Sequence, residues 1–394
     1  MKTLNIRLRS LAVFRSLLRD PVIAALAQYL DTPAGETAEA VSRYAEFVSQ
    51  LYATGSDDLT AYVKTIVGND ENPYIRLVGR GVTPSAQMEK CVERELSILQ
   101  TVAELTPEAL CRDLNWQESL PGFTPGCIDL AEYYRERCRR VGEFGYGIYA
   151  RYRMFYIDAA GKIVPVENPD ATRLSELIDY KREQQIILDN TTALLQGRPA
   201  ANILLTGDAG TGKSSTVKAV VNELWMQGLR ILEVRKEQLH QIPGVLDALS
   251  DNPLKFIMFI DDLSFRKDDD NFSALKAILE GSVSAKSANV VIYATSNRRH
   301  LVKETFSDRE GDDIHHNDTV QEIISLSERF GIQITFQKPN KKTYLEIGHH
   351  LAQQRGISYD PVRLEMEAER FALNRGGRSA RAATQFVDSL MAKA

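Results

Sequence analysis

The sequence has few cysteines and no long hydrophobic run. Only four of its 394 residues are cysteine, and no two of them form a C-x-x-C pair, so a disulfide scaffold is not expected in a chain of this length. No apolar stretch reaches the roughly 18–20 residues that span a bilayer. The N-terminus also lacks the apolar core of a signal peptide, because Arg7, Arg9 and Arg15 interrupt it, and a transit peptide is the lesser alternative. We expect a cytoplasmic protein with reduced thiols and no membrane span.

Neither sign of charge dominates the chain. There are 48 basic and 53 acidic residues, which give a net charge of −5. This balance provides no overall reason to expect nucleic acid or an anionic membrane as the partner, although a local basic patch is compatible with it. With 43% hydrophobic and 26% charged residues, the composition is that of a globular protein, and its length suggests two or three domains.

The chain contains no internal repeat, and its pattern changes near residue 168. Residues 1–168 have helical periodicity, a short hairpin expected at 154–166, and no chemical motif. From 169 to 338, helical segments alternate with short apolar runs, as in strands buried on both faces of a parallel sheet. Residues 339–394 lack strands and are expected to form a helical lid. The predicted strands are Ile203–Thr206, Arg230–Val234, Phe256–Ile260, Val290–Ala294 and Ile332–Phe336.

A glycine-rich loop follows the first predicted strand and precedes a predicted helix. Its pattern, G-x-x-x-x-G-K-S, in this context indicates a phosphate-binding loop, because glycines let backbone N–H groups point at phosphate oxygens. Lys213 is expected to reach the β- and γ-phosphates, and the Ser214 hydroxyl to ligate Mg²⁺. The residues expected to contact ATP are Gly207, Asp208, Ala209, Gly210, Thr211, Gly212, Lys213, Ser214 and Ser215.

Two more of the apolar runs end in residues suited to phosphate chemistry. Asp261 and Asp262 follow the strand expected at 256–260. A carboxylate there lies beside the phosphate loop and holds Mg²⁺, the role predicted for Asp261, while Asp262 is the candidate to polarise the attacking water. A helix N-cap is the alternative for these acids. Asn297, after the strand that begins at Val290, is the candidate to bond the γ-phosphate or the water, with a turn residue as the alternative.

The order of these motifs resembles that of an AAA+ ATPase, in which they would be Walker A, Walker B and sensor 1. The resemblance covers residues 170–394 and implies a P-loop AAA+ parallel-sheet core with a C-terminal helical lid, preceded by a mostly helical N-terminal domain. More narrowly, four stretches are similar to a family of bacterial AAA+ ATP-binding proteins of unknown function. These are Asn202–Ser215, Phe256–Phe265, Tyr293–Leu301 and Ile324–Phe330.

The resemblance also implies roles for arginines. Arg329 would be an arginine finger that acts on the nucleotide of a neighbouring subunit, which implies a homo-oligomer. Arg378 would be sensor 2 in the lid, with Arg381 as the second candidate. A helix-end cation is the alternative for Arg329, and a surface salt bridge is the alternative for Arg378.

Three features of the sequence depart from the AAA+ pattern. The second Walker B acid is usually glutamate, and Asp262 is one methylene shorter. The glycine usual in the segment that lies against the adenine is replaced by Asp179 or Tyr180. The stretch Glu233–Ser250, where threading motors place an aromatic pore loop, has no Phe, Tyr or Trp, which disfavours a protein-threading motor.

These features predict an ATPase that couples Mg-ATP hydrolysis at a subunit interface to remodelling of an unidentified protein or nucleic-acid partner. The alternative is an ATP-dependent switch or scaffold with negligible turnover, which the shorter Asp262 would favour. A small-molecule kinase is a weaker third possibility, because the chain has a lid and no evident acceptor site.

Overall fold

The computed structural model describes residues 2–33, 35–112, 114, 116–264, 270–280, 288–297 and 328–392. The chain divides into two compact units, Met1–Arg151 and Tyr152–Ala394, whereas the sequence placed the boundary near 168. The hairpin accounts for the difference, because its first strand pairs with the large sheet and so belongs to the second unit. Among the described residues, no helix combines the length and the hydrophobicity that a membrane crossing would require.

Helices build the first unit. Two of them begin at a capping side chain: Ser85 Oγ accepts a hydrogen bond from the N–H of Met88, and Thr106 Oγ1 accepts one from that of Ala109. The helices are α1 (Lys2–Arg9), the 3₁₀ helix η1 (Arg15–Arg19), α2 (Pro21–Leu30), α3 (Thr37–Ala53), α4 (Leu59–Asn69), α5 (Pro73–Gly79), α6 (Ala86–Ala103), α7 (Pro107–Cys111), α8 (Leu130–Arg139), α9 (Val141–Phe144) and α10 (Ile148–Arg151).

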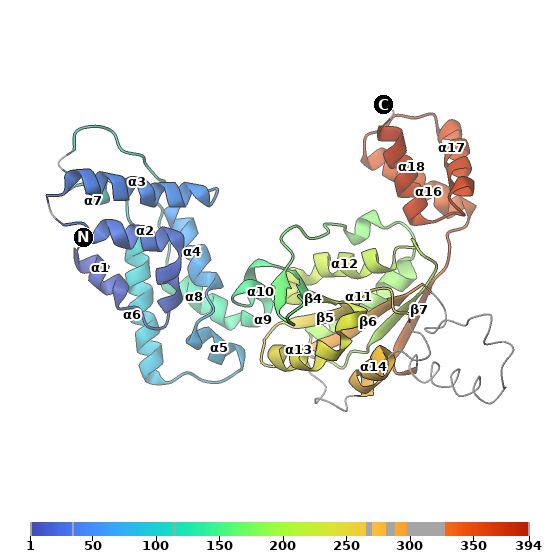
Figure 1. The fold of residues 1–394 in the computed structure, drawn as a ribbon, viewed down its shortest axis with the longest axis horizontal. Helices are drawn as coiled ribbons and strands as arrows, with labels where there is room; N and C mark the ends of the chain where they lie inside the picture. The colour runs from blue at the N-terminus through green and yellow to red at the C-terminus, as the bar shows by residue number, and fades with distance from the viewer. Residues whose placement is uncertain are drawn as a thin grey trace. The chain divides into compact units, whose positions relative to one another are not determined.

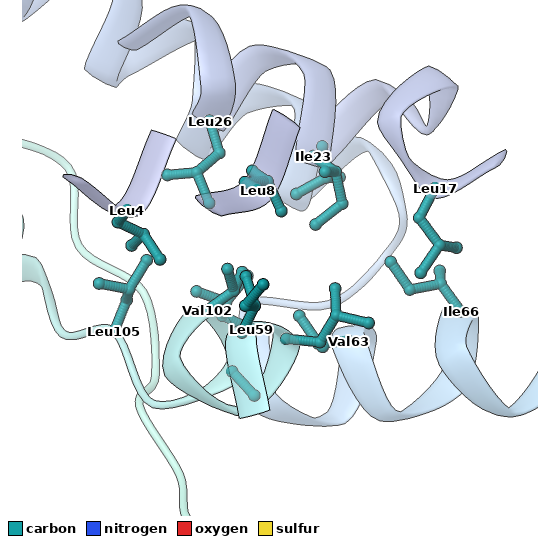
Figure 2. Close-up of a cluster of buried hydrophobic side chains, with 14 of the residues drawn as sticks. Leu4, Leu8, Leu17, Ile23, Leu26, Leu59, Val63, Ile66, Val102 and Leu105 are labelled. Carbon is teal, nitrogen blue, oxygen red and sulfur yellow. The ribbon is translucent and has the colours of Figure 1, made fainter. Parts of the chain in front are cut away.

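The core of this unit forms between α1 and α2 on one side and α4 and α6 on the other. Figure 2 shows Leu8 of α1 and Leu26 of α2 pointing toward Leu59 and Val63 of α4. All four side chains are fully buried, so removing their apolar surface from water stabilises the helical packing.

One carboxylate is buried against this core. Glu95 of α6 has no exposed surface, and its two oxygens accept hydrogen bonds from the N–H groups of Ala12, Val13 and Phe14 at 2.7–3.3 Å. These N–H groups lie between α1 and η1, where no helix satisfies them. Glu95 therefore fixes the path of the chain between the first two helical segments.

A seven-stranded sheet forms the centre of the second unit, in the order β2-β1-β4-β5-β6-β3-β7. Among the described strands, β2 alone is antiparallel to its neighbour. The five strands predicted after residue 170 are all present, within two residues of the expected ends. The strands are β1 (Met154–Ile157), β2 (Ile163–Pro165), β3 (Ile203–Gly207), β4 (Leu229–Val234), β5 (Lys255–Ile260), β6 (Val290–Ser296) and β7 (Ile332–Phe336).

Helices cover both faces of this sheet, as its nearly continuous apolar strands predicted. In Figure 1, α11 and α12 lie along one face, with α13 and α14 along the other. The connecting helices are η2 (Leu174–Glu176), α11 (Lys181–Leu195), α12 (Lys213–Leu224), η3 (Trp225–Gln227), η4 (Lys236–Gln241), α13 (Ile242–Leu249) and α14 (Asp270–Glu280). This arrangement confirms the predicted α/β class.

The lid consists of α16 (Lys341–Gln354), α17 (Pro361–Asn374) and α18 (Ala380–Met391), which share a small apolar core of their own. Ile178, from the segment before α11, packs against this core. The lid also touches the phosphate loop, because the N–H of Arg381 donates a hydrogen bond to the carbonyl of Gly210 at 3.2 Å.

The strand order determines which side chains meet. β6 lies between β3 and β5, and the carboxyl ends of these parallel strands share one edge of the sheet. Residues that follow β6 therefore lie between the loop after β3 and the acids after β5. In open α/β sheets, ligands bind at this edge, where the strand order reverses.

Candidate nucleotide-binding site

The loop between β3 and α12 curls through three glycines with positive φ, which are Gly207 at 139°, Gly210 at 78° and Gly212 at 94°. A Cβ atom on Gly207 would lie 2.1 Å from the carbonyl oxygen of Phe336 in β7. Only glycine combines this backbone conformation with so close an approach. Glycine adopts such conformations without steric cost, and a loop of this kind can direct its backbone N–H groups at an anion.

Lys213, the first residue of α12, points into this loop. Its ammonium donates hydrogen bonds to the carbonyls of Gly207 and Asp208, both at 2.9 Å, and to Oδ1 of Asn297 at 3.0 Å. The side chain is almost fully buried, and burial lowers the pKa of Lys213, although the carboxylates of Asp261 and Asp262 oppose this effect. An anionic phosphate beside the ammonium would favour its charged form further.

The two acids after β5 contact different partners. Asp261 Oδ1 accepts hydrogen bonds from the hydroxyls of Ser214 at 2.7 Å and Thr295 at 2.5 Å. Asp262 Oδ1 accepts one from the amide of Asn297 at 2.6 Å. Asn297 therefore joins Lys213 to Asp262, and the structure brings the predicted loop, acids and amide into one cluster.

Asp262 has a left-handed backbone, with φ of 55°, and its N–H donates to Thr295 Oγ1 at 2.9 Å. Aspartate adopts this conformation more readily than most residues that carry a Cβ atom, because its short polar side chain can bond locally. Nothing in the sequence pattern predicts this turn, and the hydrogen bonds of Thr295 to the two acids were not predicted.

A hollow of about 740 Å³ extends from the phosphate loop to the lid. Its lining includes most of the predicted loop residues, both acids and Asn297. Glu176 and Leu177 come from the segment before α11, which the resemblance places against the adenine. The lining residues that were not predicted are Thr172, Thr295, Leu351, Gln354, Arg355, Ala380 and Thr384.

Tyr180, one of the two positions at which the resemblance implies a glycine, has a backbone conformation that glycine favours. Its φ is 66°. Its ring packs on Phe336 with centroids 4.7 Å apart, and its hydroxyl donates to the carbonyl of Gln337. These contacts hold a tyrosine in a backbone region that bulky residues seldom adopt.

The three predicted arginines lie in different places. Arg329 precedes β7 and pairs with Glu280 of α14, near the amino ends of the strands. Arg378 is held by Glu369 in the lid and is absent from the lining of the hollow, whereas Arg381 lines it. Parts of the motif stretches, at 265, 298–301 and 324–327, lie outside the described residues.

The donor set fits Mg²⁺ bound together with a nucleotide. One carboxylate, Asp261, faces one hydroxyl, Ser214, and the described residues contain no cluster of three or more His, Cys, Asp or Glu side chains that would form a metal cage. Magnesium commonly binds through one or two carboxylates plus substrate phosphates. The oxygen ligands present suit that mode.

Among known protein families, the one described as "Protein of unknown function (DUF815)" matches residues 150–394. No similar curated protein was found. Solved structures with a similar fold include the Thermotoga maritima RuvB Holliday junction branch migration motor, at 17% identity and a TM-score of 0.36 over 55% of this chain. C. elegans PCH-2 is similar at 17% identity and a TM-score of 0.34 over 48% of this chain. The matches span only 63% of the RuvB chain and 51% of the PCH-2 chain.

Proposed function

Because this chain belongs to the DUF815 family, whose description assigns no function, we propose its activity from the geometry of the site. It binds Mg-ATP and hydrolyses the bond between the β- and γ-phosphates. The convergence of Lys213, Asn297 and Asp262 at neighbouring strand ends, joined by hydrogen bonds of 3.0 and 2.6 Å, carries the proposal. A cation, an amide and a carboxylate in contact can together bind a phosphate and orient the water that attacks it.

The phosphate loop and Lys213 hold the β- and γ-phosphates in this scheme. Phosphate oxygens replace the carbonyls of Gly207 and Asp208 and the Asn297 amide as acceptors for the Lys213 ammonium. Ser214 and Asp261 hold Mg²⁺, which when bound neutralises charge that develops on the phosphates. Asp262 polarises the attacking water, and Asn297 orients the water or the γ-phosphate.

Arg329 is proposed to act on the nucleotide of another copy of the chain. Arg329 lies near Ile332, which pairs with Ile203 at the start of β3. The phosphate loop begins at Gly207, at the opposite end of β3. A strand of this length separates the two ends by roughly 13–16 Å. An Arg329 side chain is too short to cover that distance to its own loop, which favours action between subunits of a homo-oligomer.

Arg381 is the lid arginine that we assign to the nucleotide. It lines the hollow and lies at the first turn of α18, against Gly210. Arg378 instead donates two hydrogen bonds to Glu369. Nucleotide binding would draw Arg381 toward the phosphates and move the lid, and this motion is proposed to remodel an unidentified protein or nucleic-acid partner.

Steady-state hydrolysis of ATP tests the proposal. The wild type should turn over ATP faster than Lys213→Ala, and Arg329→Ala should lose most of that turnover. Light scattering with and without ATP should detect an oligomer. Wild-type turnover no greater than that of Lys213→Ala would end the proposal of hydrolysis, and a monomer under both conditions would end the proposal of action between subunits.

The second candidate is a nucleotide-dependent switch with negligible turnover, which the short Asp262 side chain favours. A switch would bind Mg-ATP with wild-type turnover at the level of Lys213→Ala. Affinity capture with Asp262→Asn, which should retain ATP, would identify partners that bind the ATP-bound state. Recovery of the same proteins with Lys213→Ala would mean that nucleotide does not control partner binding.

A further inference from the structure

Thr295 lies at the end of β6 and contacts both acids that follow β5. Its side chain is buried, with 2% of its surface exposed. The hydroxyl donates its single proton to Asp261 Oδ1 at 2.5 Å and accepts the N–H of Asp262 at 2.9 Å. One oxygen atom thus uses its donor and one acceptor site on adjacent residues.

The backbone around Thr295 reinforces these contacts. The ladder between β5 and β6 ends at the pair Ile260 and Ala294. Beyond it, the N–H of Leu263 donates to the carbonyl of Thr295 at 2.7 Å, and the hydroxyl of Ser296 donates to the carbonyl of Leu263 at 2.8 Å. The turn that carries both acids is therefore attached to the end of β6 by four hydrogen bonds.

We propose that Thr295 is a positioning residue that gives the two adjacent carboxylates different tasks. Its donated hydrogen bond turns Asp261 toward Ser214, where the metal would bind. Its accepted hydrogen bond holds the peptide of Asp262 in the left-handed conformation, from which that side chain points to Asn297. The inference rests on the proposed binding of Mg-ATP and adds a residue through which both acids act.

The same geometry explains why the second acid is aspartate. A left-handed residue is costly unless it is glycine or has a short polar side chain, as asparagine and aspartate do. Glutamate, with one more methylene, gains less from local hydrogen bonding. The turn imposed by Thr295 thus favours Asp262 at a position where AAA+ ATPases usually have glutamate.

Two substitutions separate the hydroxyl from the shape of the side chain. Thr295→Val replaces the hydroxyl by a methyl group, and Thr295→Ser retains it. Thr206→Val is the matched control, since Thr206 is also buried at a strand end but its hydroxyl contacts Thr335 of β7, at 3.0 Å, and neither acid.

The first measurement is the Mg²⁺ concentration that gives half-maximal binding of a fluorescent ATP analogue. Thr295→Val should raise it by about 10- to 100-fold, the usual cost of losing a group that orients a metal ligand. Thr295→Ser and Thr206→Val should stay close to the wild type. An unchanged Mg²⁺ requirement in Thr295→Val, or an equal change in Thr295→Ser, would overturn the inference.

The second measurement is the split between kcat and KM for ATP. Thr295→Val should lower kcat by about 10- to 100-fold because Asp262, the acid that polarises the water, is misplaced, with a smaller change in KM at saturating Mg²⁺. A kcat equal to that of the wild type would contradict the role assigned at Asp262. Thermal unfolding monitors folding of each variant, and Thr295→Ala replaces Thr295→Val if the latter does not fold.

The two measurements keep this inference distinct from the proposed function. If the wild type binds the analogue but does not hydrolyse ATP, hydrolysis fails as a proposal, and the Mg²⁺ titration still decides the role of Thr295. If the wild type binds no nucleotide with Mg²⁺, both proposals fail.

Discussion

Arg378 donates two hydrogen bonds to Glu369, from Nε to Oε1 at 2.8 Å and from Nη2 to Oε2 at 2.6 Å. This two-point contact lowers the pKa of Glu369 through the hydrogen bond from the guanidinium. It joins α17 to the residues just before α18, both within the lid. Such bidentate pairs fix geometry as well as adding energy, so the contact holds the start of α18 against α17.

The two lid arginines should therefore respond differently to substitution. Arg381→Ala should weaken binding of Mg-ATP by roughly tenfold to a hundredfold, the cost of losing a hydrogen bond between charged groups. Arg378→Ala should mainly increase hydrogen exchange in α17 and α18. Titration with a fluorescent ATP analogue and exchange mass spectrometry measure the two effects. A larger loss of affinity in Arg378→Ala than in Arg381→Ala would reverse the assignment.

Nucleotide should stabilise the second unit in a way that depends on Lys213 and on magnesium. A ligand that binds only the folded state, at about 100 times its Kd, adds about 2.7 kcal/mol of stability. Mg-ATP should therefore raise the unfolding temperature of the wild type and leave that of Lys213→Ala nearly unchanged. Chelating Mg²⁺ should reduce the shift, because the described site offers one carboxylate and one hydroxyl and no metal cage. A full shift in Lys213→Ala would contradict the site.

The left-handed turn at Asp262 predicts an order of stability among variants. Asp262→Asn should unfold near the temperature of the wild type, and Asp262→Glu should unfold at a lower temperature. The loss in free energy of unfolding in Asp262→Glu should be less than the roughly 1–2 kcal/mol that a fully disfavoured left-handed residue costs. Differential scanning calorimetry without nucleotide measures the difference and excludes any contribution from catalysis. Equal stability of Asp262→Glu and the wild type would show that the turn does not select aspartate.

Glu95 should be important for the first unit and irrelevant to the second. Glu95→Ala leaves the N–H groups of Ala12, Val13 and Phe14 without their acceptor. Two of these residues, Val13 and Phe14, are buried, and the cost is about 3 kcal/mol or more. Amide hydrogen exchange should accelerate in α1 and η1, while Mg-ATP binding stays unchanged. Glu93→Ala, an exposed position on the same helix, is the control. Equal exchange in the two variants would mean that the buried carboxylate contributes little.

Local patterns predicted the strands and the phosphate loop, because both depend on neighbouring residues. β7 begins and ends where the apolar run does, and the glycines at 207, 210 and 212 carry the positive φ values that the loop needs. The pairing of β1 with β4 was not predicted. A four-residue strand in a hairpin has the same pattern whether it stands alone or joins a sheet, so only tertiary contacts decide its place.

The contacts that orient the site were also beyond the sequence pattern. Thr295 precedes Asn297 in a run that reads simply as a buried strand, and its hydrogen bonds depend on β5 lying beside β6. Tyr180 has a left-handed backbone although it is not glycine, because Phe336 and Gln337 provide contacts that offset the strain. A pattern records which residues are present, whereas these roles follow from long-range packing.

The position of β3 in the sheet has a consequence for how the chain folds during synthesis. Its two neighbours, β6 and β7, both come later in the sequence, so during synthesis the strand that carries the phosphate loop emerges well before either of the strands that will flank it. Until residues 290–296 have emerged, the backbone N–H and C=O groups along both edges of β3 have no partner, and such unpaired edges favour aggregation. A nascent chain stalled before β6 should therefore depend on chaperones and be unable to retain ATP. A chain extended through the lid should fold without chaperones and bind ATP.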